Sequence, residues 1–174
     1  MKKGLDFLLR EQKENGSWFG RWGTNYVYGT WSALCALAIA GVAVDSAAVR
    51  KAVEWLESKQ RHDGGWGETG ESYYPERTEG SFTKLSTPSQ TAWAVLGLLA
   101  AGEVDSDAVK HGVNFLLRAE RSGPKWDEAE HTAVGFPRVF YLRYHGYSAY
   151  FPLWALARYR TLKDQNDRRT RYGM

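Results

Sequence analysis

A repeated pattern constrains the fold of this chain more than any other feature of its sequence. Each copy contains a small residue, a pair made of an aromatic residue and Leu, then Gln or Glu, Gly and Trp. The second copy follows the first by 48 residues, and the third follows by 60 more, apart from a Gly shifted by one. The copies are Gly4, Phe7, Leu8, Gln12, Gly16 and Trp18; Ala52, Trp55, Leu56, Gln60, Gly64 and Trp66; and Gly112, Phe115, Leu116, Glu120, Gly123 and Trp126. Such periods are typical of stacked units that share a continuous core.

Each unit is predicted to contain an amphipathic helix and a more apolar one. Apolar side chains occur at helical spacing in residues 3–12, 49–60 and 109–120. Three further stretches are apolar on all sides, as in buried helices, and these are residues 31–43, 90–101 and 151–160. Nothing alternates usefully with a period of two, so strands are expected to be minor. The sequence predicts an all-α fold, an α/α toroid or part of one, with inner and outer helices.

The repeated Gln and Trp are predicted to be structural. A Gln amide can bond backbone groups left free at helix ends, and a Trp ring can pack over the junction between two units. The Asp-Ser pairs at 45–46 and 105–106 precede two of the amphipathic stretches and are predicted N-caps. The residues expected to join the units are Gln12, Trp18, Gln60, Trp66 and Trp126.

The units are expected to form one domain over residues 1–162, followed by a basic tail over 163–174. Residues 73–84 account for the extra 12 residues of the longer repeat and are predicted to be an inserted loop. The tail contains Arg168, Arg169 and Arg171 and is expected to be solvated.

Composition excludes several classes of protein. Hydrophobic residues make up 43% and charged residues 25% of the 174 residues, which are globular values. The net charge of +3 does not suggest a nucleic-acid partner. Cys35 is the single cysteine, so no intramolecular disulfide or zinc cluster of usual spacing is expected, and a cytoplasmic location is favoured. The longest apolar run, 33–44, is too short to span a bilayer.

Longer motifs around the repeats identify a family. The repeat itself resembles the QW motif of triterpene cyclases, and the string from Gly16 to Thr30 resembles bacterial squalene–hopene cyclases in particular. So do Ser86-Thr87-Pro88-Ser89-Gln90-Thr91-Ala92-Trp93, Gly135-Phe136-Pro137 and Phe140-Tyr141-Leu142. The resemblance runs from about Gly4 to Arg160 and matches the C-terminal part of that family's chain.

The resemblance implies an isomerase that needs no metal and no cofactor. Such enzymes protonate a linear polyprene, here expected to be squalene, and cyclise it to a polycyclic triterpene. The proton comes from an Asp-x-Asp-Asp motif, which this sequence lacks; the nearest string, Asp105-Ser106-Asp107-Ala108, occupies a helix-capping position. The chain is therefore expected to supply walls of the substrate cavity. Its expected partner is the rest of a longer cyclase, and that full-length enzyme is expected to associate with a membrane surface.

Four aromatic residues are candidates for stabilising the carbocations. Phe136, Phe140, Tyr144 and Tyr147 are spaced by 4, 4 and 3 residues, which predicts one stripe along a helix with Pro137 in its first turn. The residues alone favour core packing. The resemblance places Phe136 and Phe140 against the cations, and the two tyrosines along or behind the cavity wall. An aromatic face attracts a cation by roughly 0.5 to 2 kcal/mol without capturing it.

Two residues of the first unit are also implied by the resemblance. Trp22 is expected to hold the folded polyene, and Tyr28 to support the hydrogen-bond network around the acid. Trp31 stands where relatives are expected to have a smaller residue, and either trims the cavity or fills an outer gap. Arg138 and Arg143 add charge near the aromatic stripe and are expected to face solvent or an ion pair.

Three other functions stay open from the sequence. Carboxylates follow two of the Trp turns and could serve a toroidal glycoside hydrolase or lyase, although solvated ion pairs or caps are favoured. They are Glu68, Glu71, Asp127, Glu128 and Glu130. A protein prenyltransferase would need a zinc site that Cys35 and the four histidines do not form by spacing. The chain could also be an inactive scaffold that forms dimers or higher oligomers through exposed inner helices.

Overall fold

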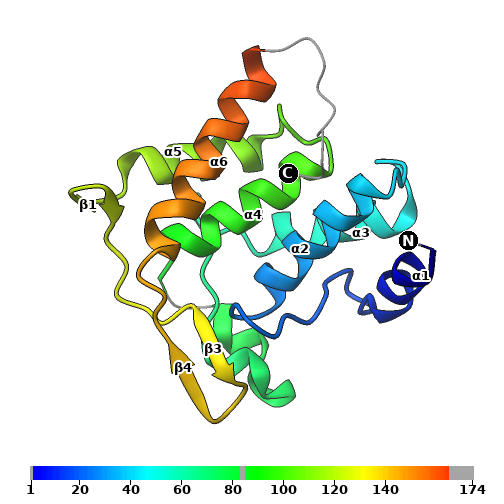
Figure 1. Ribbon diagram of the computed structural model, residues 1–174, viewed down its shortest axis with the longest axis horizontal. Helices are drawn as coiled ribbons and strands as arrows, with labels where there is room; N and C mark the ends of the chain where they lie inside the picture. The colour runs from blue at the N-terminus through cyan, green and yellow to red at the C-terminus, as the bar shows by residue number, and fades with distance from the viewer. Residues whose placement is uncertain (1, 83–84, 165–174) are drawn as a thin grey trace.

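The computed structural model describes residues 2–82 and 85–164 and is mostly helical (Figure 1). Its α-helices are α1 (Lys2–Glu11), α2 (Tyr26–Ile39), α3 (Ala47–Ser58), α4 (Pro88–Ala100), α5 (Asp107–Arg118) and α6 (Tyr147–Asp164). Short 3-10 turns cover Gly70–Tyr73, Pro75–Arg77 and Glu79–Phe82, where an inserted loop was expected. Two small antiparallel pairs join β1 (Arg121–Ser122) to β2 (Lys125–Trp126) and β3 (Ala133–Phe136) to β4 (Phe140–Leu142).

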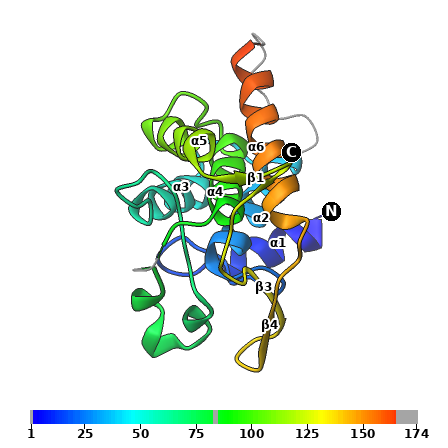
Figure 2. The same ribbon diagram turned by 90° about the vertical axis from the view of Figure 1, so that its left-hand side faces the viewer.

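The helices form two layers. Helix α4 packs between α2 and α6, and α3 and α5 lie together on the other side of α4 (Figure 2). The predicted alternation of outer and inner helices is present, and the observed helix bounds differ from the predicted ones by up to a few residues. These layers form part of a ring. Helix α6 continues to Asp164, so the first two residues of the predicted tail are helical, and the remaining tail residues, 165–174, lie outside the described part.

The repeated Gln and Trp join neighbouring units by backbone hydrogen bonds. The Gln12 amide donates to the carbonyl oxygens of Gly16, at 2.9 Å, and Ala48, at 2.8 Å. The Gln60 amide donates to those of Gly64, at 2.8 Å, and Ala108, at 2.9 Å. Each Gln therefore ties the end of one outer helix to the first turn of the next.

The three Trp indoles all bond back to the helix that precedes them. Trp18 donates to Leu8, Trp66 to Leu56 and Trp126 to Leu116, over 2.8, 2.7 and 2.7 Å. All three rings are buried. A carbonyl near a helix C-terminus lacks its own helical donor, so each indole satisfies one of these groups.

The N-caps of two helices follow the sequence prediction. Ser106 accepts a hydrogen bond from the Val109 amide at 3.2 Å at the start of α5, as its residue type predicts. Ser46 is also the N-cap residue of α3, but its hydroxyl makes no such bond. At α4, Thr87 is the cap and Pro88 occupies the first turn, where a missing N–H costs nothing.

The predicted helical stripe of aromatic residues is wrong, because the segment forms a hairpin. Phe136 ends β3 and pairs with Phe140 at the start of β4, around a turn in which Arg138 has a φ of 67°. Pro137 disfavours helical backbone at the residue before it, and the Val and aromatic residues nearby suit an extended strand. A Cβ on Gly135 would overlap the Phe140 ring, so any other residue here would displace that ring. A spacing of four residues fits both a helix and a tight hairpin.

None of the described helices is long and apolar enough to cross a membrane.

Candidate aromatic site

Trp22 is held by the first loop, which pairs with strand β3. The Val134 amide donates to the Trp22 carbonyl at 3.0 Å, and the Thr24 amide donates to the Thr132 carbonyl at 3.0 Å. The Tyr73 hydroxyl, which comes from the inserted segment, donates to the carbonyls of Gly20 and Gly23 at 3.2 and 3.0 Å. Because its backbone is fixed from two sides, the loop holds the Trp22 side chain outward, 58% exposed.

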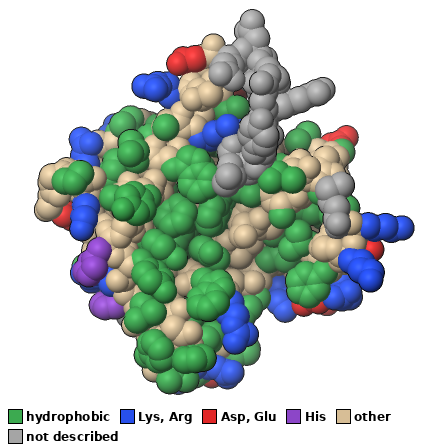
Figure 3. All heavy atoms as spheres, in the orientation of Figure 1, with side chains coloured by type: hydrophobic (Ala, Val, Ile, Leu, Met, Phe, Trp, Pro, Cys, Tyr) green, Lys and Arg blue, Asp and Glu red, His purple; other side chains and the backbone are tan. Residues whose placement is uncertain are grey.

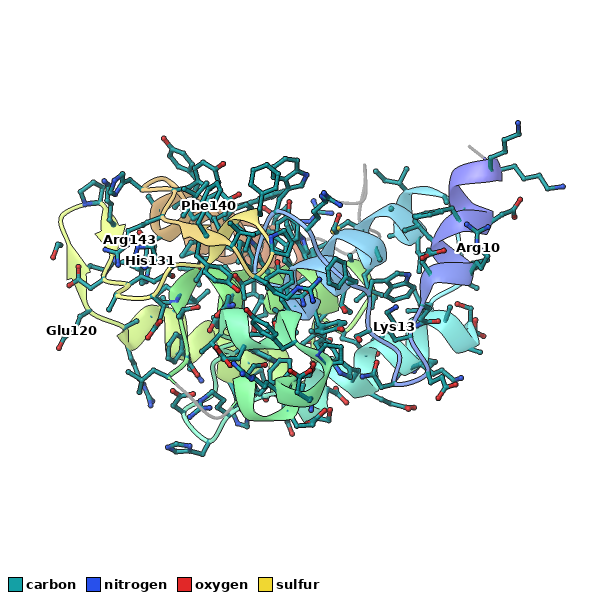
Figure 4. All side chains as sticks on the ribbon, turned by 90° about the horizontal axis from the view of Figure 1, so that it is seen from below. Arg10, Lys13, Glu120, His131, Phe140 and Arg143 are labelled. Carbon is teal, nitrogen blue, oxygen red and sulfur yellow. The ribbon has the colours of Figure 1, made fainter. Side chains whose placement is uncertain are left out.

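Phe136 and Phe140 form a pair of exposed rings on the hairpin. Their centroids are 5.5 Å apart and their planes meet at 72°, an edge-to-face arrangement. Phe136 is 58% and Phe140 43% exposed. Figure 4 shows Phe140, Arg143 and His131 at the end of the molecule opposite Arg10. The hairpin thus presents two aromatic rings at its surface on a short, paired backbone.

Tyr144 and Tyr147 lie where the hairpin meets α6. Their ring centroids are 5.0 Å apart, and Tyr147 begins α6 while Tyr144 precedes the helix. Tyr147 also contacts Phe151, at 5.1 Å, and Trp93, at 5.7 Å. Burial raises the pKa of Tyr147 to about 12, so its hydroxyl stays protonated at neutral pH.

Tyr28 contacts the same buried indole from α2. Its ring meets Trp93 edge-on at 5.0 Å and Trp31 edge-on at 5.4 Å. A Cβ on Gly23 would overlap the Tyr28 ring, so the Trp22 loop approaches this ring closely only because Gly occupies that position. Burial raises the pKa of the Tyr28 phenol. Tyr28 and Tyr147 are therefore brought together through Trp93, although they lie far apart in the sequence.

The predicted residues consequently fall into two groups. Tyr28, Tyr147 and Tyr144 belong to an aromatic network around Trp93, whereas Phe136 and Phe140 pair on the hairpin. No ring contact within the described residues links the phenylalanine pair to that network. Trp22 is connected to the hairpin through backbone hydrogen bonds.

Trp31, the residue that departs from expectation, fills space between inner helices. Its ring stacks on Trp93 with centroids 6.2 Å apart and planes 8° apart. It also meets Phe151 at 5.4 Å and Trp154 at 6.1 Å, both on α6. The ring therefore bridges α2 and α6 over α4.

The two arginines beside the hairpin make specific contacts. The Arg138 guanidinium lies 5.9 Å from the centroid of the Tyr74 ring, and Arg143 donates to the Ala129 carbonyl. Both side chains are exposed, which confirms the expectation that they face solvent.

Two of the candidate carboxylates cap helices, and of these Glu68 is buried and Glu128 is half-buried. Glu68 accepts hydrogen bonds from the Tyr26 and Val27 amides, both at 2.9 Å, at the start of α2. Glu128 accepts from the Ser89 amide at 2.8 Å and hydroxyl at 3.0 Å, at the start of α4. Each carboxylate comes from the unit that follows the helix it caps. Burial raises the pKa of both carboxyls, while the donated hydrogen bonds oppose that shift.

Helix caps were one of the two roles favoured for these carboxylates, and the position of Glu68 and Glu128 in the repeat agrees with that role. Glu68 and Glu128 each stand two residues after a repeated Trp, and in the first copy that position is Gly20. Both oxygens of Glu68 accept hydrogen bonds from backbone amides. This buried carboxyl is therefore not placed to act as the general acid or base of a glycoside hydrolase. Glu71, another candidate, pairs with Arg77 at 3.0 Å on the surface. The described residues contain no group of three or more His, Cys, Asp or Glu side chains placed to hold a metal ion.

The sequence of this chain matches a known protein family and several known proteins over most of its length. The family described as the squalene–hopene cyclase C-terminal domain matches residues 1–161. The chain belongs to this family. A squalene–hopene cyclase from Zymomonas mobilis is 57% identical over 174 residues, covering 100% of this chain and 26% of the relative. One from Alicyclobacillus acidocaldarius is 44% identical and covers 92% of this chain and 25% of the relative.

Another relative carries a different name. A dammaradiene synthase from the fern Dryopteris crassirhizoma is 44% identical over 91% of this chain and 25% of its own length. The chain thus spans about a quarter of the length of these squalene–hopene cyclases and related proteins. Relatives that are named as different enzymes therefore share this segment.

Proposed function

We propose that this chain works as part of a longer squalene–hopene cyclase and forms one wall of the cavity in which a linear polyprene, squalene, is cyclised. In that enzyme the helix layers complete an α/α toroid together with the rest of the chain. The exposed Phe136–Phe140 pair carries the proposal, because a rigid hairpin presents two aromatic rings at the surface with no buried partner for their outer faces.

The chemistry divides between this chain and the rest of the enzyme. An acid outside the present sequence adds a proton to a terminal double bond of the polyprene. Each ring closure then consumes a double bond and moves the positive charge along the chain, until loss of a proton or capture of water ends the reaction. Phe136, Phe140 and Trp22 stabilise the cations by their ring faces and hold the folded hydrocarbon.

The two tyrosines near Trp93 are assigned supporting roles. Burial keeps the phenols of Tyr28 and Tyr147 neutral, so neither becomes an anion that would capture a carbocation. Tyr28 supports the hydrogen-bond network of the acid, and Tyr144 and Tyr147 buttress the cavity wall. We place the whole enzyme on the cytoplasmic side of a membrane, bound to its surface without crossing it.

A chimera tests this proposal directly. This chain replaces the matching quarter of the Zymomonas mobilis relative, and the purified protein is incubated with squalene in detergent, with products followed by gas chromatography and mass spectrometry. We expect cyclic triterpenes, a drop of at least tenfold with Phe140→Ala, and early-terminated products in the remainder. Leu9→Ala, an exposed apolar change on α1, is the control. A folded chimera that makes no product, or one that Phe140→Ala leaves unchanged, would contradict the proposal.

A second function rests on the exposed apolar side chains of the isolated chain. Trp22, Ile39, Phe136, Tyr150 and Leu153 are all more than half exposed. A surface of this kind favours association, so the isolated chain is proposed to be an inactive, self-associating scaffold. Sedimentation of the isolated chain as a monomer at micromolar concentration would contradict this second proposal.

A further inference from the structure

Two stripes of side chains meet where α2 and α6 face the viewer in Figure 3, on a side of the molecule that shows many hydrophobic side chains. On α6 the stripe is Tyr147, Phe151, Trp154 and Arg158, spaced by 4, 3 and 4 residues, so these side chains share one face of the helix. On α2 it contains Trp31 and Cys35, four residues apart. The stripes touch through the rings of Trp31, Phe151 and Trp154.

Arg158 is the last residue of the α6 stripe. Two of the three nitrogen atoms of its guanidinium lack a hydrogen-bond acceptor among the described residues. Its Nε and Nη2 atoms are buried and make no hydrogen bond to any residue within 2–82 or 85–164. Buried donors are almost always paired in folded proteins, and a buried charge without a partner is costly. This corner of the aromatic face is therefore incomplete.

The environment of Cys35 links these groups. Burial raises the pKa of its thiol to about 12, and both Trp31 and Arg158 act on that thiol in the opposite direction, so all three lie close together. Loss of hydration lowers the pKa of Arg158 itself. The cation therefore lies in a desolvated setting close to the neutral Cys35 thiol.

The free edge of Arg158 specifies the missing group. Nε and Nη2 form the side-on fork of the guanidinium, whose two parallel N–H groups match the two oxygens of a carboxylate. The rings beside it match an apolar surface. We infer that this face binds a segment from the rest of the longer cyclase, and that an Asp or Glu on that otherwise apolar segment pairs with Arg158. The inference rests on the proposed function only in assuming that the rest of the enzyme packs against this chain.

Two observations favour this occupant over others. The chain spans about a quarter of the length of its relatives, so a large part of the enzyme is available to cover the face. The face is mainly aromatic with one buried cation, which suits a packed segment carrying a single carboxylate more than an anionic membrane surface. A membrane would be matched by several exposed cations.

The test compares one substitution in two contexts. Arg158→Met keeps the length of the side chain and removes its charge, and Arg160→Met is the matched control on an exposed position of the same helix. In the isolated chain we expect Arg158→Met to leave the thermal unfolding midpoint unchanged or raise it, because a desolvated cation without a partner is removed. In the chimera with the Zymomonas mobilis relative we expect the same change to lower the midpoint by several degrees, while Arg160→Met shifts it by less than one degree.

The partner is then identified by pairing substitutions in the chimera. Single Asp→Asn and Glu→Gln changes in the relative's part are combined with Arg158→Met, and one of them should show no further loss in the double variant. Equal effects of Arg158→Met in both contexts, no added stability of the chimera over the isolated chain, or no coupled acid would overturn the inference. Binding to anionic vesicles, or self-association of the chain, would also overturn the inference if either depended on Arg158. A chimera that is inactive yet shows the coupled pair would contradict only the proposed function.

Discussion

Helices α4 and α1 show how far burial depends on neighbours. All 13 residues of α4 are buried, and none of the residues of α1 is. Helix α2 has a composition as apolar as that of α4, yet only six of its 14 residues are buried. Helix α4 is covered by α2 on one side and α6 on the other, whereas α1 and α2 end the described stack. In a repeat fold the outermost units keep open the faces that inner units cover.

The same contrast holds for α6 at the other end. Only Pro152, Ala155 and Leu162 are buried along its 18 residues, although its sequence contains many aromatic side chains. The open sides of α2 and α6 therefore carry the residues assigned to the contact with the rest of the enzyme, such as Trp31 and Arg158, whereas Phe136, Phe140 and Trp22 lie on the hairpin and the first loop. Helix α4 therefore contributes mainly to the buried core, whereas α1, α2 and α6 contribute mainly exposed faces.

The largest expected effect is on the covered helix. Leu98→Ala empties a fully buried position in α4 and should lower the free energy of unfolding by about 2–5 kcal/mol. The same change at Leu9 in α1, which is 44% exposed, should cost less than about 0.5 kcal/mol. Urea denaturation followed by tryptophan fluorescence measures both. Equal losses would show that α1 is covered in solution, for example by a second copy of the chain.

The junctions between units should show a smaller difference. Gln60→Ala removes one hydrogen bond to the Gly64 carbonyl in the turn after α3 and one to the Ala108 carbonyl in α5, and should lower the free energy of unfolding by about 1–2 kcal/mol. Gln12→Ala removes the equivalent pair but attaches only the uncovered α1, so it should speed amide hydrogen exchange in α1 and leave the global unfolding transition nearly unchanged. A full global loss from Gln12→Ala would mean that α1 unfolds together with the core.

The buried Glu68 cap gives a pH dependence of known sign. Burial raises the pKa of Glu68, so between the unfolded and folded pKa values the native chain holds a proton that the unfolded chain releases. The free energy of unfolding should therefore fall as the pH rises from about 4.5 through that window, by at most about 1.4 kcal/mol per pH unit for this group.

Urea denaturation at a series of pH values measures this slope, and Glu68→Gln is the comparison. The variant loses one accepted amide bond at every pH but should lack the slope due to Glu68. If the wild-type chain instead became more stable across this range, and Glu68→Gln lacked that rise, the hydrogen bonds from Tyr26 and Val27 would outweigh burial.

The smallest expected effect is at the open end. Leu153 on α6 is 62% exposed and lines a hollow between α5 and α6. Leu153→Ser should change the free energy of unfolding by less than about 0.5 kcal/mol, yet shift sedimentation toward smaller species if the open faces drive self-association. An unchanged distribution of species would exclude this part of the surface from the contact between copies.

The helical repeat was predictable because its signals are local. Helical spacing, the Asp-Ser pairs and the recurrence of Gln12 and Gln60 at fixed offsets locate the helices and their junctions without knowledge of the fold. The aromatic candidates were also found, but their setting was wrong. Phe136 and Phe140 recur at a spacing shared by helices and hairpins, and only the pairing of β3 with the Trp22 loop selects the hairpin.

What the sequence alone determined is the family, the order of the helices and the residues that join them. Only the tertiary structure showed which helices Glu68 and Glu128 cap, that Trp31 bridges two inner helices, and that two buried nitrogens of Arg158 have no acceptor among the described residues. The physical reason is that each of these depends on a neighbour many residues away. Periodicity records what a residue does within its own helix, but burial and hydrogen-bond partners are set by the elements that pack against it.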